Sequence, residues 1–256
     1  MQWLRPEKLE KSLFKDYVYH RQTLQDLATK YNKSIQWVHY KIKEYLPIAK
    51  VHNPRAVNLI CDATFYGKRK DKLGTLVFMD SITHEILIWK HIQTERVDDY
   101  KYLLVELLNL GYTILYVTID VKRGVNSYPL QMCHFHQKRI IQRYITLNPK
   151  LEASQELKKI MTKLKYSDES RFSKALDIWY IKYKDFLNEI TLPPYNRKYS
   201  FTYKNHNKLN LSNTTNLIEG GAFSPLKILI KIHRGLSKNL KLKIVDDYLV
   251  SYKKRE

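Results

Sequence analysis

The chain has 256 residues, of which 44% are hydrophobic, and this composition is typical of a folded protein and excludes an intrinsically disordered one. No apolar run approaches the roughly 20 residues that span a bilayer, and the charged N-terminus lacks the apolar stretch of a signal peptide, so we expect a cytoplasmic protein with no membrane partner. The formal net charge of +20 predicts a polyanionic partner, although a generic lysine-rich surface would give the same composition.

Charge and cysteine usage narrow the kind of site to expect. Residues 51–120 carry slightly more acidic than basic side chains, whereas the segments on both sides are basic. This pattern fits an active site that concentrates carboxylates inside a surface that binds phosphates. The two cysteines, Cys61 and Cys133, are too few for a disulfide framework or a four-cysteine zinc site, and we expect small buried hydrophobic residues.

The first fifty residues contain two short helical patterns. Apolar residues recur at helical spacing on both sides of 31–34, and Ser34 is suited to cap the second helix because its hydroxyl accepts a first-turn N–H. The pattern predicts a helix-turn-helix in a DNA-binding region over 1–50, the alternative being an ordinary helical hairpin. The expected outward-facing residues of the second helix are Gln36, Trp37, His39, Tyr40, Lys41 and Lys43.

Strand patterns begin after the linker marked by Pro47 and Pro54. Runs of β-branched and aromatic residues, separated by turn residues, predict strands at 56–66, 75–79, 86–91, 113–119 and, less regularly, 130–135. The first three suggest an antiparallel meander. The run at 113–119 is nearly all apolar, as expected for a central strand with both faces covered. A helix is predicted over 98–110, with acidic residues at its start and a glycine after its end.

The second half of the chain is predominantly helical in pattern. Helices are predicted within 137–190, and a last helical region runs with breaks from about 215 to 254. The order of strands and helices is that of an α/β fold, a ribonuclease H-like mixed sheet with a helical insertion. We therefore expect a core over 55–136 and 213–250, with a mainly helical insertion at 137–212.

Two aspartates occupy strand positions where a charge needs a partner. Asp62 lies among apolar residues of the first strand, where a charge is costly unless it is paired or binds a metal. Asp120 ends the apolar fourth strand, and open α/β sheets form their sites at such ends. If the two strands pair, both carboxylates meet at one edge, and Mg²⁺ favours such oxygen ligands. The alternative for each is a simple turn residue at a strand end.

A third carboxylate would come from the distal helical part. The acidic candidates there are Glu219, Asp246, Asp247 and Glu256. Glu219 is preferred because a capping-type segment, 213–215, leads into a helix about one turn before it. We expect Asp246 and Asp247 to lie on a solvated helix face.

The sequence resembles the DDE transposases of bacterial insertion sequences in the Mutator-like superfamily. The similar stretches are CDATFYG around Asp62, VTID at Asp120, QMCHFHQKRIIQRYIT (131–146), NTTNLIEG (213–220) and FSPLKILIKIHRGLS (223–237). The resemblance covers most of 15–250. It implies a ribonuclease H-like catalytic core in which Asp62, Asp120 and Glu219 hold Mg²⁺ or Mn²⁺. It also implies that Cys133 and His136 form the family's Cys-x-x-His signature near the site.

Several further residues are candidates for contacts around the site. His136 is expected to have a structural or DNA-positioning role, the alternative being a satisfied histidine near the core. Asn213 and Asn216 are expected to cap the helix, contact DNA, or do both. His233 and Arg234 are expected to contact phosphates.

The resemblance implies hydrolysis of phosphodiester bonds at element ends and joining of a 3′-hydroxyl to target DNA. It further implies double-stranded DNA as partner, a homo-oligomer on that DNA, and a bacterial nucleoid location. Two other interpretations stay open. One is a non-catalytic DNA-binding protein, either an inactive transposase remnant or a helix-turn-helix regulator, and the other is a nuclease acting on RNA or hybrids.

The sequence departs from the family pattern in three places. No zinc ribbon precedes the helix-turn-helix, and the stretch 191–212 is shorter than expected. The segment Gly220-Gly221-Ala222 is one residue longer than expected between Glu219 and the next conserved block of the family.

Overall fold

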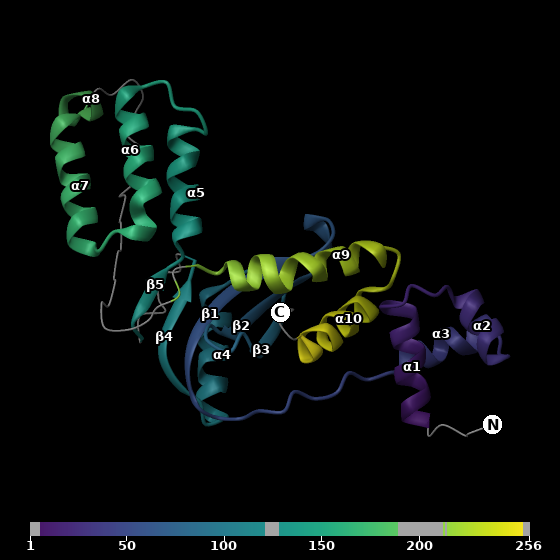
Figure 1. The fold of residues 1–256 in the computed structure, drawn as a ribbon. Helices are drawn as coiled ribbons and strands as arrows, with labels where there is room; N and C mark the ends of the chain where they lie inside the picture. Colours follow the sequence, from purple (N-terminus) through teal and green to yellow (C-terminus); the bar gives the residue numbers. More distant parts are fainter. Residues whose placement is uncertain (1–5, 121–127, 189–211, 213, 253–256) are drawn as a thin grey trace.

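A five-stranded mixed sheet forms the centre of the structure (Figure 1). The computed structural model describes residues 6–120, 128–188, 212 and 214–252. In chain order the strands are β1 (Ala56–Phe65), β2 (Gly74–Asp80), β3 (Ile86–Ile92), β4 (Thr113–Ile119) and β5 (Leu130–Met132). Their spatial order is β3-β2-β1-β4-β5, so the protein is an α/β protein with β1 at the middle of its sheet.

The pairing of the strands confirms two predictions from sequence. β1, β2 and β3 form an antiparallel meander, and the first and fourth strands are neighbours, because β4 runs parallel to β1. β5 continues the sheet in parallel with β4. It ends at Met132, three residues earlier than predicted, because Cys133 is already the N-cap of the next helix.

Apolar side chains cover the sheet on both faces. On one face, buried residues such as Leu59, Cys61 and Phe78 pack against α4 (Val97–Asn109). On the other face, Ile60 and Val77 share a core with the C-terminal elements η3 (Leu217–Phe223), α9 (Ser224–Ile232) and α10 (Lys238–Ser251). Alternating strand residues therefore enter different cores, as the pleat of a strand requires. A charged residue within β1 consequently has little contact with water.

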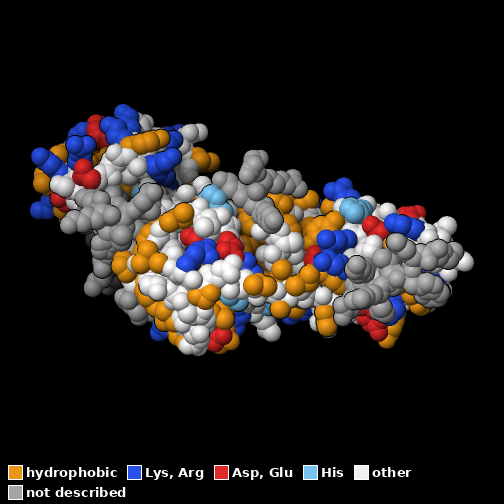
Figure 2. Space-filling view, turned by 60° about the horizontal axis from the view of Figure 1, so that its bottom comes forward, with side chains coloured by type: hydrophobic (Ala, Val, Ile, Leu, Met, Phe, Trp, Pro, Cys, Tyr) orange, Lys and Arg blue, Asp and Glu red, His pale blue; other side chains and the backbone are white. Residues whose placement is uncertain are grey.

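The predicted helical insertion forms a lobe beside the sheet (Figure 1). Its elements are α5 (His134–Ile145), α6 (Glu152–Lys163), the 3₁₀ turn η2 (Leu164–Tyr166), α7 (Glu169–Lys182) and α8 (Lys184–Asn188). The lobe has a small core of its own, made by Ile141, Met161, Leu164 and Phe172. Lys and Arg side chains stand out on its surface among apolar ones (Figure 2). Among the helices that the structure describes, none has the length and apolar character needed to cross a membrane.

The N-terminal region consists of α1 (Pro6–Val18), α2 (Leu24–Tyr31) and α3 (Ile35–Glu44). Local sequence signals define the two short helices. Thr23 and Asp26 form a capping box at the start of α2, and Asn32 ends it in the left-handed conformation at φ 50°. Ser34 caps α3 by accepting the backbone N–H of Trp37 at 3.2 Å, as the sequence predicts.

The N-terminal helices pack on the end of the chain. Asp247 of α10 is only 7% exposed, and its carboxylate accepts hydrogen bonds from the hydroxyls of Tyr19 (2.7 Å) and Tyr45 (2.5 Å). Asp246 accepts the indole N–H of Trp89 at 2.7 Å. The prediction that Asp246 and Asp247 lie on a solvated helix face is therefore wrong. Both carboxylates satisfy polar groups that packing of α10 would otherwise leave unpaired.

Candidate active site

Strand register brings Asp62 and Asp120 to neighbouring positions. In the parallel ladder, Cys61 of β1 pairs with Ile119 of β4, and the two aspartates are the next residue on each strand. Adjacent strands lie about 4.8 Å apart, so the two Cα atoms are next to each other at the carboxyl edge of β4. This edge is where open α/β sheets form their sites.

Glu219 approaches the same edge from η3, a π-helical segment that packs against β1. The backbone N–H of Ser224 bonds to the carbonyl of Glu219, five residues earlier. A π-turn accommodates one residue more than an α-turn does, and such turns often occur at functional sites. All three residues of Gly220-Gly221-Ala222 lie within η3. The apolar side of α9, with Leu226 and Ile230, remains buried.

The electrostatics couple Asp62 to Glu219. The pKa of the Asp62 carboxyl is raised to about 7, mainly by burial and in smaller part by the nearby Glu219 carboxylate, while the hydrogen bond from Ala63 and the charge of His136 oppose the rise. The only hydrogen bond to the Asp62 carboxylate from the described residues comes from the backbone N–H of Ala63, at 2.8 Å. Oε2 of Glu219 is buried and accepts no hydrogen bond from the described part of the chain. Such a carboxylate pair is stabilised by a cation placed between its members.

His136 is a cationic neighbour of these carboxylates. Its Nε2 atom lies 3.9 Å from Oδ2 of Asp120. Contact with Cys133 raises the pKa of the His136 imidazole to about 9, and the carboxylates of Asp120 and Asp62 add to this rise while burial opposes it. The ring is therefore protonated at neutral pH, and its charge partly compensates the aspartates.

Cys133 connects this cluster to the segment that carries Glu219. Its thiol is fully buried, and burial raises its pKa, but contacts with His136 and Thr215 lower it more, to about 7. The sulfur accepts the backbone N–H of Thr215 at 3.3 Å and lies 3.5 Å from the Thr215 hydroxyl. The hydroxyl of Thr118, in β4, donates to the carbonyl of Ser212 at 2.8 Å. The approach to η3 is thus fixed to both β4 and α5.

The donor set suits a hard divalent cation. Two carboxylates in a poorly hydrated position, one with an oxygen that accepts no hydrogen bond, offer the oxygen ligands that Mg²⁺ and Mn²⁺ prefer. Within the described ranges, no group of three or more His, Cys, Asp or Glu residues is arranged to hold a metal ion. The Glu219 carboxylate is near enough to raise the pKa of Asp62, whereas Asp120 has the imidazole of His136 as its neighbour.

The predicted DNA-reading residues of α3 divide into two groups. Gln36, Tyr40 and Lys43 are exposed and lie three and four residues apart, which puts them on one helix face. Trp37, His39 and Lys41 are half-buried. Nζ of Lys41 forms ion pairs with Glu10 at 3.1 Å and Glu44 at 2.6 Å, so its charge is already compensated within the protein.

The remaining predicted contacts also differ in exposure. Arg234 and Asn216 are exposed, whereas Asn213 and Glu256 lie outside the described residues. His233 is 8% exposed, and its Nε2 lies 3.1 Å from the backbone carbonyl of Val18. The ring therefore joins α9 to α1, which corrects the prediction of a phosphate contact. A short polar motif does not reveal that another helix will cover it.

Sequence reasoning missed Thr215 and the two α9 cations, Lys227 and Lys231, that precede the predicted contact Arg234. Lys227, Lys231 and Arg234 are all exposed and recur at helical spacing. This spacing was readable in the sequence, because residues three and four apart lie on one side of a helix. The link between Thr215 and Cys133 had no such signal, since 82 residues separate the two partners.

Comparisons with known proteins give weak likeness to solved structures and no other match. No family model and no curated protein matches the chain. Among solved structures, the chain is similar to one from the cryo-EM structure of the simian T-cell lymphotropic virus intasome in complex with PP2A regulatory subunit B56 gamma, at 15% identity. The match covers 78% of this chain and 81% of that chain with a TM-score of 0.24, a level of similarity that carries no argument.

Proposed function

We propose that the protein is a DDE-type transposase that cuts phosphodiester bonds at insertion-sequence ends and joins the 3′-hydroxyl to target DNA. The observation that carries this proposal is the convergence of Asp62, Asp120 and the Glu219-bearing η3 on the carboxyl edge of the two central parallel strands. The strand order supports a ribonuclease H-like core, in which a meander precedes two parallel strands and a helical lobe precedes the last acidic residue.

The carboxylates would hold Mg²⁺ or Mn²⁺. Asp62, Asp120 and Glu219 would each supply a carboxylate ligand. When bound, the ion contributes Lewis-acid charge that activates a water or a 3′-hydroxyl and stabilises the leaving oxygen. Burial of Asp62 and the unsatisfied oxygen of Glu219 support this assignment, because His136 compensates the charge of Asp62 only in part and Oε2 of Glu219 has no hydrogen-bond partner among the described residues.

The residues of the Cys-x-x-His signature act as positioning groups in this proposal. The imidazolium of His136 orients Asp120 and adds a positive charge beside the position of a scissile phosphate. Cys133 keeps His136 and the segment before Glu219 at a fixed separation. Neither residue needs to exchange a proton with substrate for this role.

End recognition is assigned to the N-terminal helices. Two short capped helices joined by a tight left-handed turn support a helix-turn-helix, with α3 as the recognition helix. Its exposed face carries Gln36, Tyr40 and Lys43. The partner would be double-stranded DNA in a bacterial nucleoid, bound by a homo-oligomer, because a transposition event requires two element ends.

The test is cleavage and strand transfer on a duplex that carries the inverted repeats flanking the gene. We expect activity that requires Mg²⁺ or Mn²⁺ and is lost in Asp62→Asn, Asp120→Asn and Glu219→Gln. The matched control is Asp177→Asn, at an exposed position on α7, which should retain activity. Undiminished cleavage by Asp62→Asn or Asp120→Asn would refute the assignment.

A second candidate is a non-catalytic DNA-binding protein that descends from a transposase. The separation of Asp120 from a ready three-carboxylate group among the described residues favours it. Calorimetric titration with Mn²⁺ distinguishes the two. Saturable binding that Glu219→Gln weakens supports the enzyme, whereas salt-dependent DNA binding without a metal site supports the second candidate.

A further inference from the structure

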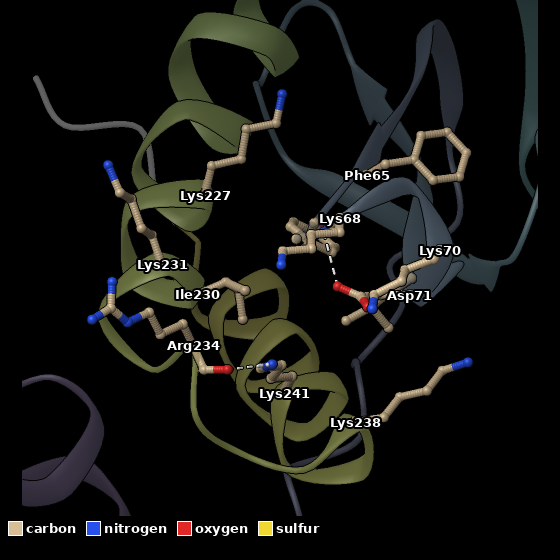
Figure 3. Close-up of a pocket in the computed structure, with 13 residues that line it drawn as sticks. Phe65, Lys68, Lys70, Asp71, Lys227, Ile230, Lys231, Arg234, Lys238 and Lys241 are labelled. Carbon is tan, nitrogen blue, oxygen red and sulfur yellow. Dashed lines mark hydrogen bonds between the residues drawn. The ribbon is translucent and has the colours of Figure 1, made fainter.

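A basic hollow opens between the turn after β1 and the helices α9 and α10 (Figure 3). Its volume is about 890 Å³. The side of the turn contributes Lys68, Lys70 and Asp71, and the helices contribute Lys227, Lys231, Arg234 and Lys238. We refer to this region as the α9 groove. The turn itself spans the 3₁₀ element η1 (Arg69–Asp71) between β1 and β2.

The α9 groove is lined by seven Lys or Arg side chains and by one carboxylate, that of Asp71. No carboxylate of the described residues lies within ion-pair distance of any of its Lys or Arg side chains, all of which are exposed at the positions named above. Asp71 accepts the backbone N–H of Lys68 at 2.8 Å and thereby stabilises the turn. Elsewhere the fold does pair its lysines, as with Lys50–Glu85 and Lys90–Asp99. Clustered charges repel one another, and an anionic ligand removes that repulsion.

The arrangement of the cations fits a linear polyanion better than a small anion. Lys227, Lys231 and Arg234 recur at helical spacing along α9 and just past its C-terminal end, next to the buried residues Leu226 and Ile230, of which Ile230 also lines the groove. Seven residues of helix extend about 10 Å. This length matches about three phosphates of one DNA strand at roughly 3.4 Å of axis per step. The lysines of the turn form the opposite wall.

Both walls continue from elements that carry the candidate catalytic carboxylates. Phe65, on the groove wall, is the third residue after Asp62 in β1, which corresponds to about 10 Å of strand. Lys227 follows Glu219 along η3 and α9 by eight residues, or about 12 Å of helix. Both walls of the groove are therefore connected to the candidate carboxylates by about 10–12 Å of β1 or of η3 and α9.

We propose that the α9 groove binds the phosphate backbone of the DNA that flanks the scissile bond. The proposal rests on the proposed function, which supplies the scissile bond, and it assigns the flanking DNA to the turn 67–72 and to α9. The recognition helix α3 would then bind a separate part of the element end. Backbone contacts of this kind position DNA without reading its sequence.

The first experiment measures binding of a fluorescein-labelled DNA duplex of arbitrary sequence by anisotropy, over a range of salt concentrations and in EDTA. The variant is the triple substitution Lys227→Gln, Lys231→Gln and Arg234→Gln. The charge-matched control is Lys163→Gln, Lys174→Gln and Lys184→Gln, at exposed positions of the helical lobe. Each lost phosphate contact lowers the slope of log affinity against log salt by about 0.9, so we expect a loss of about 2–3 in the slope.

The expected affinity loss is about 10–100-fold for the groove variant, with the control within about twofold of wild type. Equal slopes for wild type and groove variant would overturn the proposal, as would an equal loss in the control. Tighter binding of duplex RNA than of duplex DNA would overturn the choice of DNA. Because EDTA removes the metal, this result is independent of cleavage. If Asp62→Asn still cleaves DNA, the proposed catalytic function is refuted, whereas DNA binding by the α9 groove is not.

A second measurement locates the bound DNA. It uses single cysteine substitutions and so does not depend on correct folding of the triple variant. Both native cysteines are buried, so Lys231→Cys provides a single accessible thiol for an iron chelate that cuts nearby DNA. On an element-end duplex, we expect cuts confined to the few nucleotides beside the scissile bond. The same chelate at Lys174→Cys should cut elsewhere. Uniform cutting from both positions would contradict the proposal.

Discussion

The backbone N–H of Thr215 donates to the sulfur of Cys133, with an N–Sγ distance of 3.3 Å. This contact joins the start of α5 to the residues just before η3, although 82 positions separate the two partners. One turn later in α5, His136 lies beside Asp120. The Cys-x-x-His pair therefore connects two of the three candidate metal ligands, with Cys133 acting on the Glu219 side and His136 on the Asp120 side.

Replacing Cys133 should separate its hydrogen-bonding role from its packing role. Cys133→Ala leaves the buried N–H of Thr215 without an acceptor, which costs about 1–3 kcal/mol of unfolding free energy. Cys133→Ser keeps an acceptor and should retain more stability and more cleavage. Cys61 is the matched control, because it is equally buried but lies in an apolar core. Cys61→Ser should lower the unfolding free energy more than Cys61→Ala does, since its hydroxyl would be buried without a partner. Urea denaturation of the four variants shows whether Ser or Ala is the more stable replacement at each cysteine. The same replacement being more stable at both positions would contradict the role of Cys133.

Asp62→Asn should stabilise the metal-free protein while it abolishes activity. The folded-state pKa of about 7 lies above the ordinary 3.8, so ionised Asp62 destabilises the fold increasingly as pH rises from about 4 to about 7. Removing the charge should raise the unfolding free energy at pH 8 in EDTA by about 1–3 kcal/mol, measured by urea denaturation. Asp177→Asn on α7 is the exposed control and should change stability little. Equal or lower stability of Asp62→Asn would show that the site is already compensated without metal.

Local signals explain what could be predicted of the fold. Alternating strand residues, turn residues and capping hydroxyls act within a few positions of the chain, and they suffice for the meander and the α3 cap at Ser34. The pairing of β1 with β4 joins distant residues such as Cys61 and Ile119, and the sequence offers it only as one possible arrangement. The environment of Asp247 depends on Tyr19, which is 228 residues away. Helical periodicity alone cannot distinguish a solvated carboxylate from one that a distant helix covers.

The candidate site likewise has features that the sequence predicts and features that it does not. Asp62 and Asp120 follow from strand position, and their proximity follows from strand pairing. The extra residue near Gly221 was visible in the sequence, but the π-helical conformation of this segment was not, because an insertion can equally well form a loop. The same limit applies to Lys41, whose partner Glu10 comes from a different helix.

Acid should destabilise the protein through His134. Burial lowers the pKa of this imidazole to about 4, and the charge of Lys138 contributes. Because the folded-state pKa lies below the ordinary 6.5, the unfolded chain binds a proton first, and stability is lost as pH falls from about 6.5 to about 4. The loss should approach about 3 kcal/mol, with a slope of at most about 1.4 kcal/mol per pH unit. Urea denaturation across this range measures it, and His134→Gln should have a smaller slope. An unchanged slope in that variant would assign the effect to other groups.

Asp247 should be essential for docking of the N-terminal helices. Asp247→Ala removes the acceptor of two tyrosine hydroxyls and should lower the unfolding free energy by about 2–4 kcal/mol. Asp247→Asn keeps an acceptor and should cost less. Limited proteolysis should then cut the exposed connection around 46–55 sooner in Asp247→Ala than in wild type. Stability equal to that of the exposed-site control Asp185→Ala would contradict this role.

Two neighbouring lysines of α3 should respond differently to neutralisation. Lys43 is exposed on the face that also carries Gln36 and Tyr40, whereas Lys41 is held by Glu10 and Glu44. If α3 lies on DNA, Lys43→Gln removes one phosphate contact and lowers the salt slope of duplex binding by about 1. Lys41→Gln should leave that slope near the wild-type value and lower the unfolding free energy slightly, because it breaks the ion pairs with Glu10 and Glu44. Anisotropy and urea denaturation of both variants decide the matter. A salt slope that changes in Lys41→Gln but not in Lys43→Gln would require a different face of α3, or a different element, to bind DNA.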